Sequence, residues 1–177
     1  MGGEVWCGDE TTLREFPPLR ATWARRGHQA TVVISGRNGR RVLHGALNIR
    51  SGALVTVVRE RNRGADVAAL LQALGHTDPA RPRLLLWDNH PAHRTKVVQE
   101  MAQAVGVELA WLPYRSPELN PCEDLWRPMK AQVAANRAHP QVDALAAQAM
   151  DWLAGRTPEE RLRTAGLRSP KFHWLTT

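Results

Sequence analysis

One short segment constrains the fold of this chain more than any other. Four consecutive apolar residues, Leu84 to Trp87, run directly into a carboxylate, Asp88. A continuous apolar run of this length is typical of a strand buried on both faces of a sheet, which requires helices above and below it. Segments with helical periodicity flank the run, at 67–74 and 91–105. The pattern therefore predicts β-α units in the middle of the chain.

Upstream of this region, apolar and β-branched residues alternate or cluster as they do in strands, with glycine-containing turns between them. The expected strands are 5–9, 30–35, 41–49, 53–60 and, further along the chain, 107–112. We predict an α/β fold in which three antiparallel strands are followed by β-α units, so that a mixed sheet is flanked by helices.

The C-terminal part of the chain is expected to be helical. Helices are predicted at about 121–137, where Pro128 should introduce a kink, and at 141–154. Thr157 and Glu160 have the spacing of a capping box and predict the start of a last short helix. We expect one α/β core over 1–155 and a short helix with a basic tail over 156–177.

Composition excludes several classes of protein. An apolar fraction of 43% and seven Trp indicate a globular chain rather than a disordered one. No apolar run is long enough to span a bilayer, and residues 1–25 lack the layout of a signal peptide. Two cysteines, Cys7 and Cys122, are too few for a disulfide scaffold. We therefore expect a soluble, cytoplasmic protein with no membrane partner.

Positive charge is concentrated in one part of the chain. The formal net charge is +7, yet the segment 14–63 holds eleven Arg and only two acids, Glu15 and Glu60. The rest of the chain is therefore slightly acidic. A concentrated basic segment is typical of a polyanion binder such as a DNA-binding protein. The alternative is an ordinary solvated face in a chain that uses Arg in place of Lys.

Carboxylates follow two of the expected strands. Asp88 ends the apolar run, and Asp9, followed by Glu10, ends the first strand. Ligands gather at the carboxyl ends of strands in sheets of this kind, and a buried charge requires a partner or a cation. Asp88 could equally accept backbone N–H bonds at the start of the next helix. Asp9 could be a polar strand end entering a loop.

A third set of carboxylates surrounds the start of the helix at 121. Asn120 and Pro121 form a helix-start signal, and Glu123 could act as the back-bonding half of a capping interaction. Glu118, Glu123 and Asp124 are all available as ligands, and their spacing alone does not choose among them.

The segments 87–93 and 112–126, followed by Lys130, resemble the mariner-like DDE transposases, and most closely their bacterial insertion-sequence branch. In that family an Asp-Glu pair ends the first strand, which matches Asp9. The second Asp heads an Asp-Asn stretch that ends in His, which matches Asp88. A Glu follows Asn-Pro-x, which matches Glu123, and the 34 residues between Asp88 and Glu123 are characteristic of the family.

The resemblance implies an RNase H-like core in which Asp9, Asp88 and Glu123 are the catalytic residues and the ligands of two Mg²⁺ or Mn²⁺ ions. It implies hydrolysis of DNA phosphodiesters at transposon ends and transfer of the 3′-OH strand into target DNA. The implied partners are these DNAs and a second copy in a DNA-bound homodimer, in the bacterial cytoplasm. The helix-turn-helix domain that precedes the core in the family is expected to be absent from this chain.

Several residues are expected to contact DNA, although packing, capping or solvation is an alternative for each of them. They are Arg20, Trp23, Arg25, Arg26, His93, Arg115 and Lys130. Lys130 falls about two helical turns after Glu123, on the same face. Two other functions stay open: a non-transposing nuclease or resolvase of the same fold, and an inactive DNA-binding or oligomerisation remnant of a truncated transposase.

Overall fold

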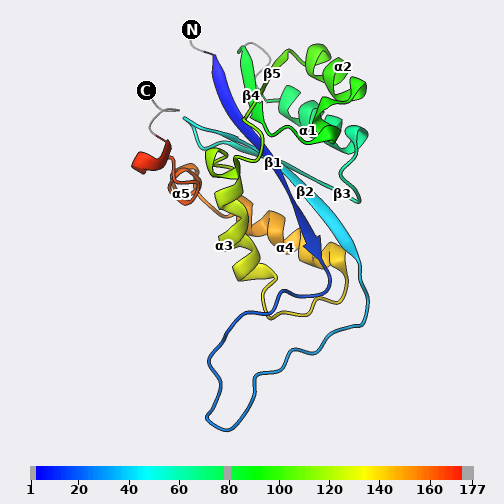
Figure 1. Ribbon diagram of the computed structural model, residues 1–177, viewed down its shortest axis with the longest axis vertical. Helices are drawn as coiled ribbons and strands as arrows, with labels where there is room; N and C mark the ends of the chain where they lie inside the picture. The colour runs from blue at the N-terminus through cyan, green and yellow to red at the C-terminus, as the bar shows by residue number, and fades with distance from the viewer. Residues whose placement is uncertain (1–2, 78–80, 173–177) are drawn as a thin grey trace.

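A computed structural model describes residues 3–77 and 81–172. Five strands form one sheet in the order β3-β2-β1-β4-β5 (Figure 1). They are β1 (Glu4–Arg14), β2 (Arg40–Asn48), β3 (Leu54–Arg59), β4 (Arg83–Trp87) and β5 (Val107–Trp111). β1 pairs antiparallel with β2 and parallel with β4, and β2 and β3 pair antiparallel. The predicted mixed sheet is therefore confirmed.

One of the predicted antiparallel strands is wrong. Residues 30–35 form no strand, and β1 takes the place of that strand because it continues to Arg14, where it pairs with Arg40. β-branched residues favour a strand only where a neighbouring strand offers hydrogen bonds and a packing surface. Residues 30–35 have neither, and Val33 is 83% exposed.

Helices cover both faces of the sheet (Figure 1). On one face lie α1 (Gly64–Gly75) and α2 (Lys96–Ala104), and on the other lie α3 (Glu123–Val133), α4 (Val142–Ala154) and α5 (Pro158–Thr164). Short 3₁₀ helices occupy Pro91–Arg94, Pro117–Leu119 and Pro170–Phe172. Within residues 3–77 and 81–172, no helix is both long and apolar enough to cross a membrane.

The helix predicted over 91–105 is divided into two parts, a 3₁₀ turn (Pro91–Arg94) and α2, with Thr95 between them. Val98 in the first turn of α2 is buried, whereas its neighbour Val97 is 42% exposed. α3 continues through Pro128. At the start of α5, the predicted capping box is confirmed by reciprocal hydrogen bonds between Thr157 and Glu160.

Two hydrophobic cores result from the alternation of side chains along the strands. Trp6 and Leu85 point to the α1–α2 face, where they pack with Leu70 and Leu71. Cys7 and Leu47 point to the α3–α4 face and pack beneath those helices. The central strands are therefore covered on both faces, as the apolar run in β4 predicts.

The segment 15–39 leaves the sheet between β1 and β2 and extends away from the rest of the molecule (Figure 1). Its base is held by the connection between α3 and α4, because the Asn136 side chain both accepts from the backbone N–H of Arg20, at 2.8 Å, and donates to its carbonyl, at 2.9 Å. Arg37 forms an ion pair with the buried Glu15 at 2.7 Å. Residues 18–31 are exposed throughout.

Candidate active site

The pairing of β1 with β4 brings two of the predicted acids together. The parallel register matches Trp6 with Leu85 and Cys7 with Leu86. Continued by two residues, the same register places Asp9 beside Asp88, which directly follows β4. The prediction that Asp9 ends a strand is wrong, since β1 runs on to Arg14 against β2. Asp9 instead lies just beyond the last residue of β1 that pairs with β4, Cys7.

Asp9 is a buried acid that faces α3. It is 7% exposed, and Trp126 Nε1 donates to its Oδ2 at 2.6 Å. Gly45 lies opposite Asp9 on β2, and a Cβ there would come within 2.7 Å of the Trp126 ring, so only glycine leaves room for this indole. Burial raises the pKa of Asp9 well above its usual value, and the charges of Glu10 and Glu123 raise it further.

Glu123 opens α3 beside Asp9. Asn120 ties this turn to β1, because its side chain donates to the carbonyl of Gly8 at 2.9 Å and accepts from the N–H of Cys122 at 3.1 Å. The backbone N–H of Asn120 donates to Pro117, so it does not need the Glu123 carboxylate, and the capping role for Glu123 is wrong. In the part of the chain that the structure describes, that carboxylate makes no hydrogen bond. Partial burial raises its pKa, as do the charges of Asp124 and Asp88.

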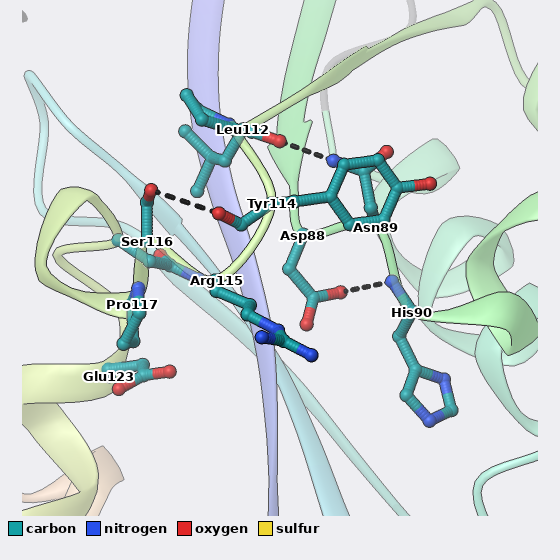
Figure 2. Close-up of a pocket in the computed structure, with 11 residues that line it drawn as sticks. Asp88, Asn89, His90, Leu112, Tyr114, Arg115, Ser116, Pro117 and Glu123 are labelled. Atoms are coloured by element: carbon teal, nitrogen blue, oxygen red, sulfur yellow. Dashed lines mark hydrogen bonds between the residues drawn. The ribbon is translucent and has the colours of Figure 1, made fainter.

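Two pockets meet at Glu123. One, of about 260 Å³, is lined by Asp88, Arg115 and Glu123, which come from three separate segments (Figure 2). The other, of about 450 Å³, is lined by Asp9 and Glu123 together with Arg20 and Lys130. Glu123 therefore connects the pocket of Asp88 with the pocket of Asp9. Glu118 lines neither pocket.

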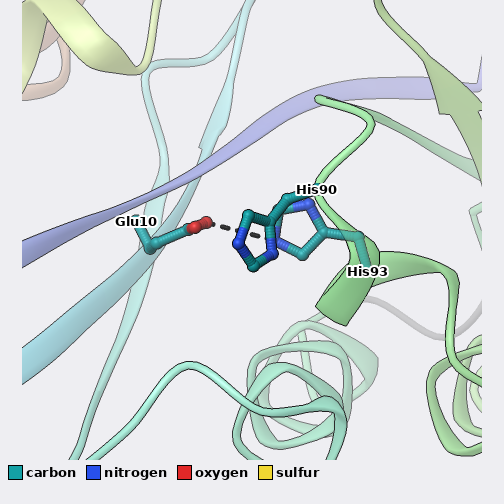
Figure 3. Close-up of side chains that lie close together, drawn as sticks. All are labelled: Glu10, His90 and His93. Atoms are coloured by element: carbon teal, nitrogen blue, oxygen red, sulfur yellow. Dashed lines mark hydrogen bonds and ion pairs between the residues drawn. The ribbon is translucent and has the colours of Figure 1, made fainter.

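Asp88 is linked to Glu10 through a buried histidine, His93, whose contact with Glu10 is shown in Figure 3. His93 is completely buried, its Nδ1 lies 2.7 Å from Asp88 Oδ1, and its Nε2 lies 3.1 Å from Glu10 Oε2. Burial disfavours the charged form of His93, yet the hydrogen bonds to both acids raise its pKa to about 9. Asp88 also accepts from the backbone N–H of His90, as its alternative role predicted. Partial burial opposes ionisation of Asp88, but these hydrogen bonds outweigh it and lower the pKa.

Two groups of side chains offer ligands for a cation. Asp9, Asp88 and Glu123 offer only carboxylate oxygens, the ligands that a hard cation such as Mg²⁺ prefers. Glu10, His90 and His93 have ligand atoms within 4.8 Å of one another and would suit a softer cation. Because both ring nitrogens of His93 already face carboxylate oxygens, this second group is better described as an ion-paired cluster.

The residues expected to contact DNA fall into three groups. Arg20, Lys130 and Arg115 line the two pockets. Trp23, Arg25 and Arg26 lie on the extended segment, where the Trp23 side chain is 100% exposed. The expectation for His93 is wrong, because a completely buried side chain that stacks on Trp87 cannot contact a phosphate.

Sequence reasoning missed two features of the site. Trp126 was not recognised as the hydrogen-bond donor to Asp9, although it lies three residues after Glu123 and so on the same face of the helix. The link between Asp88 and Glu10 was also missed, since it needs the buried position of His93. The signal in the sequence was the short spacing of five residues between Asp88 and His93. Pro91 lies between them and favours a turn, which can bring the two side chains together.

Comparison with solved structures places this fold among transposase catalytic domains. The chain superposes on the Mos1 transposase in a paired-end complex with the left transposon end, with a TM-score of 0.71, 18% identity, and coverage of 94% of this chain and 53% of that one. A mariner Mos1 paired-end complex with Mg gives a TM-score of 0.72 at 17% identity, covering 96% and 53%. The isolated catalytic domain of Mos1 mariner transposase gives 0.63 at 16% identity, covering 92% and 76%.

A curated relative comes from Shigella sonnei, where it is described as an insertion element IS630 uncharacterized 39 kDa protein. It is 28% identical over 134 residues, which are 75% of this chain and 39% of that protein. The chain thus spans well under half of this relative and about half of the Mos1 chains in the paired-end complexes.

The model of one protein family, the DDE superfamily endonucleases, matches residues 4–146. The matched segment includes Asp9, Asp88 and Glu123 and extends from β1 into α4. A match over most of the chain, together with the shared fold, establishes the family. This chain belongs to the DDE superfamily endonucleases.

Proposed function

We propose that the chain is the catalytic core of a DDE transposase, which hydrolyses phosphodiesters at transposon ends and joins the freed 3′-OH to target DNA. One observation carries the proposal: Asp9, Asp88 and Glu123, from three separate elements, surround two pockets that meet at Glu123. Beyond the effect of burial, the charge of Glu123 raises the pKa of Asp9 and the charge of Asp88 raises that of Glu123, so Glu123 lies close enough to interact with both of the other acids.

Such a group of acids fits a divalent cation site. Asp9 is buried, Trp126 Nε1 donates to its carboxylate, and an ionised carboxylate in such a position is stabilised by a cation. We propose that Asp9, Asp88 and Glu123 hold two ions, Mg²⁺ or Mn²⁺. When bound, these ions would stabilise the negative charge that builds on the attacking and leaving oxygens.

The other pocket residues are suited to holding the DNA backbone. Arg115 has a positive φ of 56°, which non-glycine residues adopt only when the surrounding structure requires it, and its side chain lines the pocket of Asp88 (Figure 2). Lys130 and Arg20 line the pocket of Asp9. We propose that these three cations bind phosphates on either side of the scissile bond, which positions it over the acids. The assembly that acts on paired ends would be a homodimer.

Nicking of supercoiled plasmid tests the proposed activity. We expect the purified chain to nick plasmid in Mg²⁺ or Mn²⁺, and to bind DNA without efficient turnover in Ca²⁺ or in a chelator. Joining of a pre-cut 3′-OH end to plasmid then separates a transposase from a resolvase-like nuclease. DNA binding without nicking in either metal would contradict the proposal and favour a non-catalytic remnant.

We further propose that the exposed segment 15–39 contacts DNA through Trp23, Arg25 and Arg26. Each phosphate that a protein neutralises contributes about −0.9 to the slope of log affinity against log salt concentration. Replacing both Arg25 and Arg26 by Ala should therefore weaken binding equally for unrelated duplexes and reduce the magnitude of the slope by about 2.

The matched control for this pair replaces Arg163 and Arg168 by Ala. Both arginines form ion pairs with Glu159 in α5, at 3.0 and 2.8 Å, and neither lines the two pockets at Glu123. Titration of fluorescent duplexes across salt concentrations measures the slope. An unchanged slope in the Arg25–Arg26 variant would contradict a DNA-contacting role for this segment.

A further inference from the structure

His93 occupies a position that links two acids from different elements. It lies in the 3₁₀ turn after β4, and its ring stacks on Trp87, with 4.2 Å between the ring centroids and 22° between the planes. The stacked ring is completely buried, so it cannot rotate away to solvent. Its two nitrogens are therefore fixed, with Nδ1 directed at Asp88 and Nε2 directed at Glu10, and the Glu10 contact is visible in Figure 3.

The Glu10 end of this link is itself held in place. Glu10 follows Asp9 on β1, but its side chain points to the opposite face of the sheet. Its Oε2 faces His93 Nε2, and its Oε1 accepts from Asn62 Nδ2 at 2.6 Å. Asn62 lies just before α1. A chain of hydrogen bonds thus runs from Asn62 through Glu10 and His93 to Asp88, and it crosses from one face of the sheet to the edge where Asp88 lies.

Asp88 needs such support because it lies outside the strand. Its side chain is 50% exposed, and the peptide that carries it belongs neither to β4 nor to the following 3₁₀ turn. An exposed carboxylate without a fixed partner samples several rotamers, which lowers its affinity for a cation that demands defined geometry. The hydrogen bonds from His93 Nδ1 and from the N–H of His90 both reach Oδ1, so Oδ2 is left for another partner.

We infer that His93 is a positioning residue: tied to Glu10 behind it, it fixes Asp88 so that one carboxylate oxygen is presented to the divalent cation. The inference rests on the proposed function, because it assigns His93 a role in the metal site. Partners that orient a metal-binding side chain typically change metal affinity or activity by about 10–100-fold when removed.

Two substitutions at His93 separate its two hydrogen bonds. The amide nitrogen of Asn can occupy the position of Nδ1, and that of Gln the position of Nε2. His93→Gln keeps a donor toward Glu10 and loses the one to Asp88, so we expect the Mn²⁺ concentration for half-maximal nicking to rise about 10–100-fold. His93→Asn should recover a large part of this loss. A role in packing alone would lower the melting temperature of both variants without changing their metal requirement.

Glu10 provides a second, independent pair of variants. Glu10→Gln retains an oxygen for Asn62 and an amide that can bond to His93, whereas Glu10→Ala removes both contacts. We expect Glu10→Ala to raise the Mn²⁺ requirement and Glu10→Gln to raise it much less. The matched control for His93→Gln is His76→Gln, at an exposed position after α1. Loss of all nicking in Glu10→Gln at saturating Mn²⁺ would overturn the inference and make Glu10 a metal ligand.

Direct Mn²⁺ binding is measured in parallel by electron paramagnetic resonance. If the wild type binds Mn²⁺ but does not nick DNA, the proposed function fails, while the order of Mn²⁺ affinities still tests His93. Equal affinity in wild type and His93→Gln would overturn the positioning role. A similar loss of affinity in His90→Ala and His93→Gln would instead indicate that Glu10, His90 and His93 bind the cation themselves.

Discussion

Replacing Asp9 by Asn should abolish DNA nicking and at the same time raise the melting temperature of the metal-free protein. Asn retains an oxygen that can accept from Trp126 Nε1, so the buried hydrogen bond at this position survives. What is lost is a negative charge that burial and the nearby Glu10 and Glu123 make unfavourable. Removal of one preorganised electrostatic group from an active site typically lowers the rate about 10²–10³-fold.

The stability change should depend on pH. Because the pKa of Asp9 is raised in the folded protein, the folded state holds this proton more tightly than the unfolded state does. Its contribution to stability is complete below the unfolded pKa of about 3.9 and is lost as the pH rises through the higher folded pKa. The advantage of Asp9→Asn over wild type should therefore grow between mildly acidic and neutral pH.

Thermal melts of the metal-free protein across this pH range measure the effect. For a chain of this size, 1 kcal/mol changes the melting temperature by about 2–4 °C, which is readily measured. The matched control is Asp151→Asn, an exposed position on α4. A lower melting temperature for Asp9→Asn at neutral pH, or nicking at the wild-type rate, would contradict the assignment of Asp9.

Replacing Glu123 by Gln should also abolish nicking, with little effect on folding. The Glu123 carboxylate has no hydrogen bond within residues 3–77 and 81–172, and partial burial, together with the charges of Asp124 and Asp88, raises its pKa. Gln removes this repulsion and keeps the shape of the side chain. The metal-free protein should therefore be as stable as wild type or slightly more stable, whereas Mn²⁺ should raise its melting temperature less than that of wild type.

Glu118→Gln is the matched control for Glu123→Gln. Glu118 lies on the same connection, is exposed and lines neither of the two pockets at Glu123. It should resemble wild type in nicking, in metal-free stability and in the Mn²⁺-dependent increase in melting temperature. Loss of nicking in Glu118→Gln, with nicking retained in Glu123→Gln, would transfer the third acid to position 118.

The sequence predicted best those parts of the fold that depend on local pattern and burial. The apolar run before Asp88 became β4, covered on both faces, and the helix predicted at 141–154 and the capping box at Thr157 were also confirmed. The segment 30–35 has the β-branched composition of a strand but lies beyond the reach of the sheet. Whether such a segment pairs depends on tertiary structure, which composition does not contain.

The site could be predicted only in part, for a similar reason. The family motif identified Asp9, Asp88 and Glu123, and the structure gathers them around adjoining pockets. The contacts that tune these acids join distant segments: Trp126 with Asp9, and His93 with Glu10. Sequence spacing can place a side chain on one face of an element but does not say which distant segment it meets, and His93 was therefore expected to contact DNA although it is buried.

The central claim is that Asp9, Asp88 and Glu123 together bind the divalent cations. Glu123 is the most exposed of the three. Titration of Mn²⁺ into wild type, Glu123→Gln and Glu118→Gln, followed through the electron paramagnetic resonance signal of free Mn²⁺, tests it directly. We expect Glu118→Gln to bind Mn²⁺ as wild type does and Glu123→Gln to bind it at least about 10-fold more weakly, as expected for loss of one oxygen ligand of a hard cation. Equal Mn²⁺ affinity in wild type and Glu123→Gln would contradict the claim.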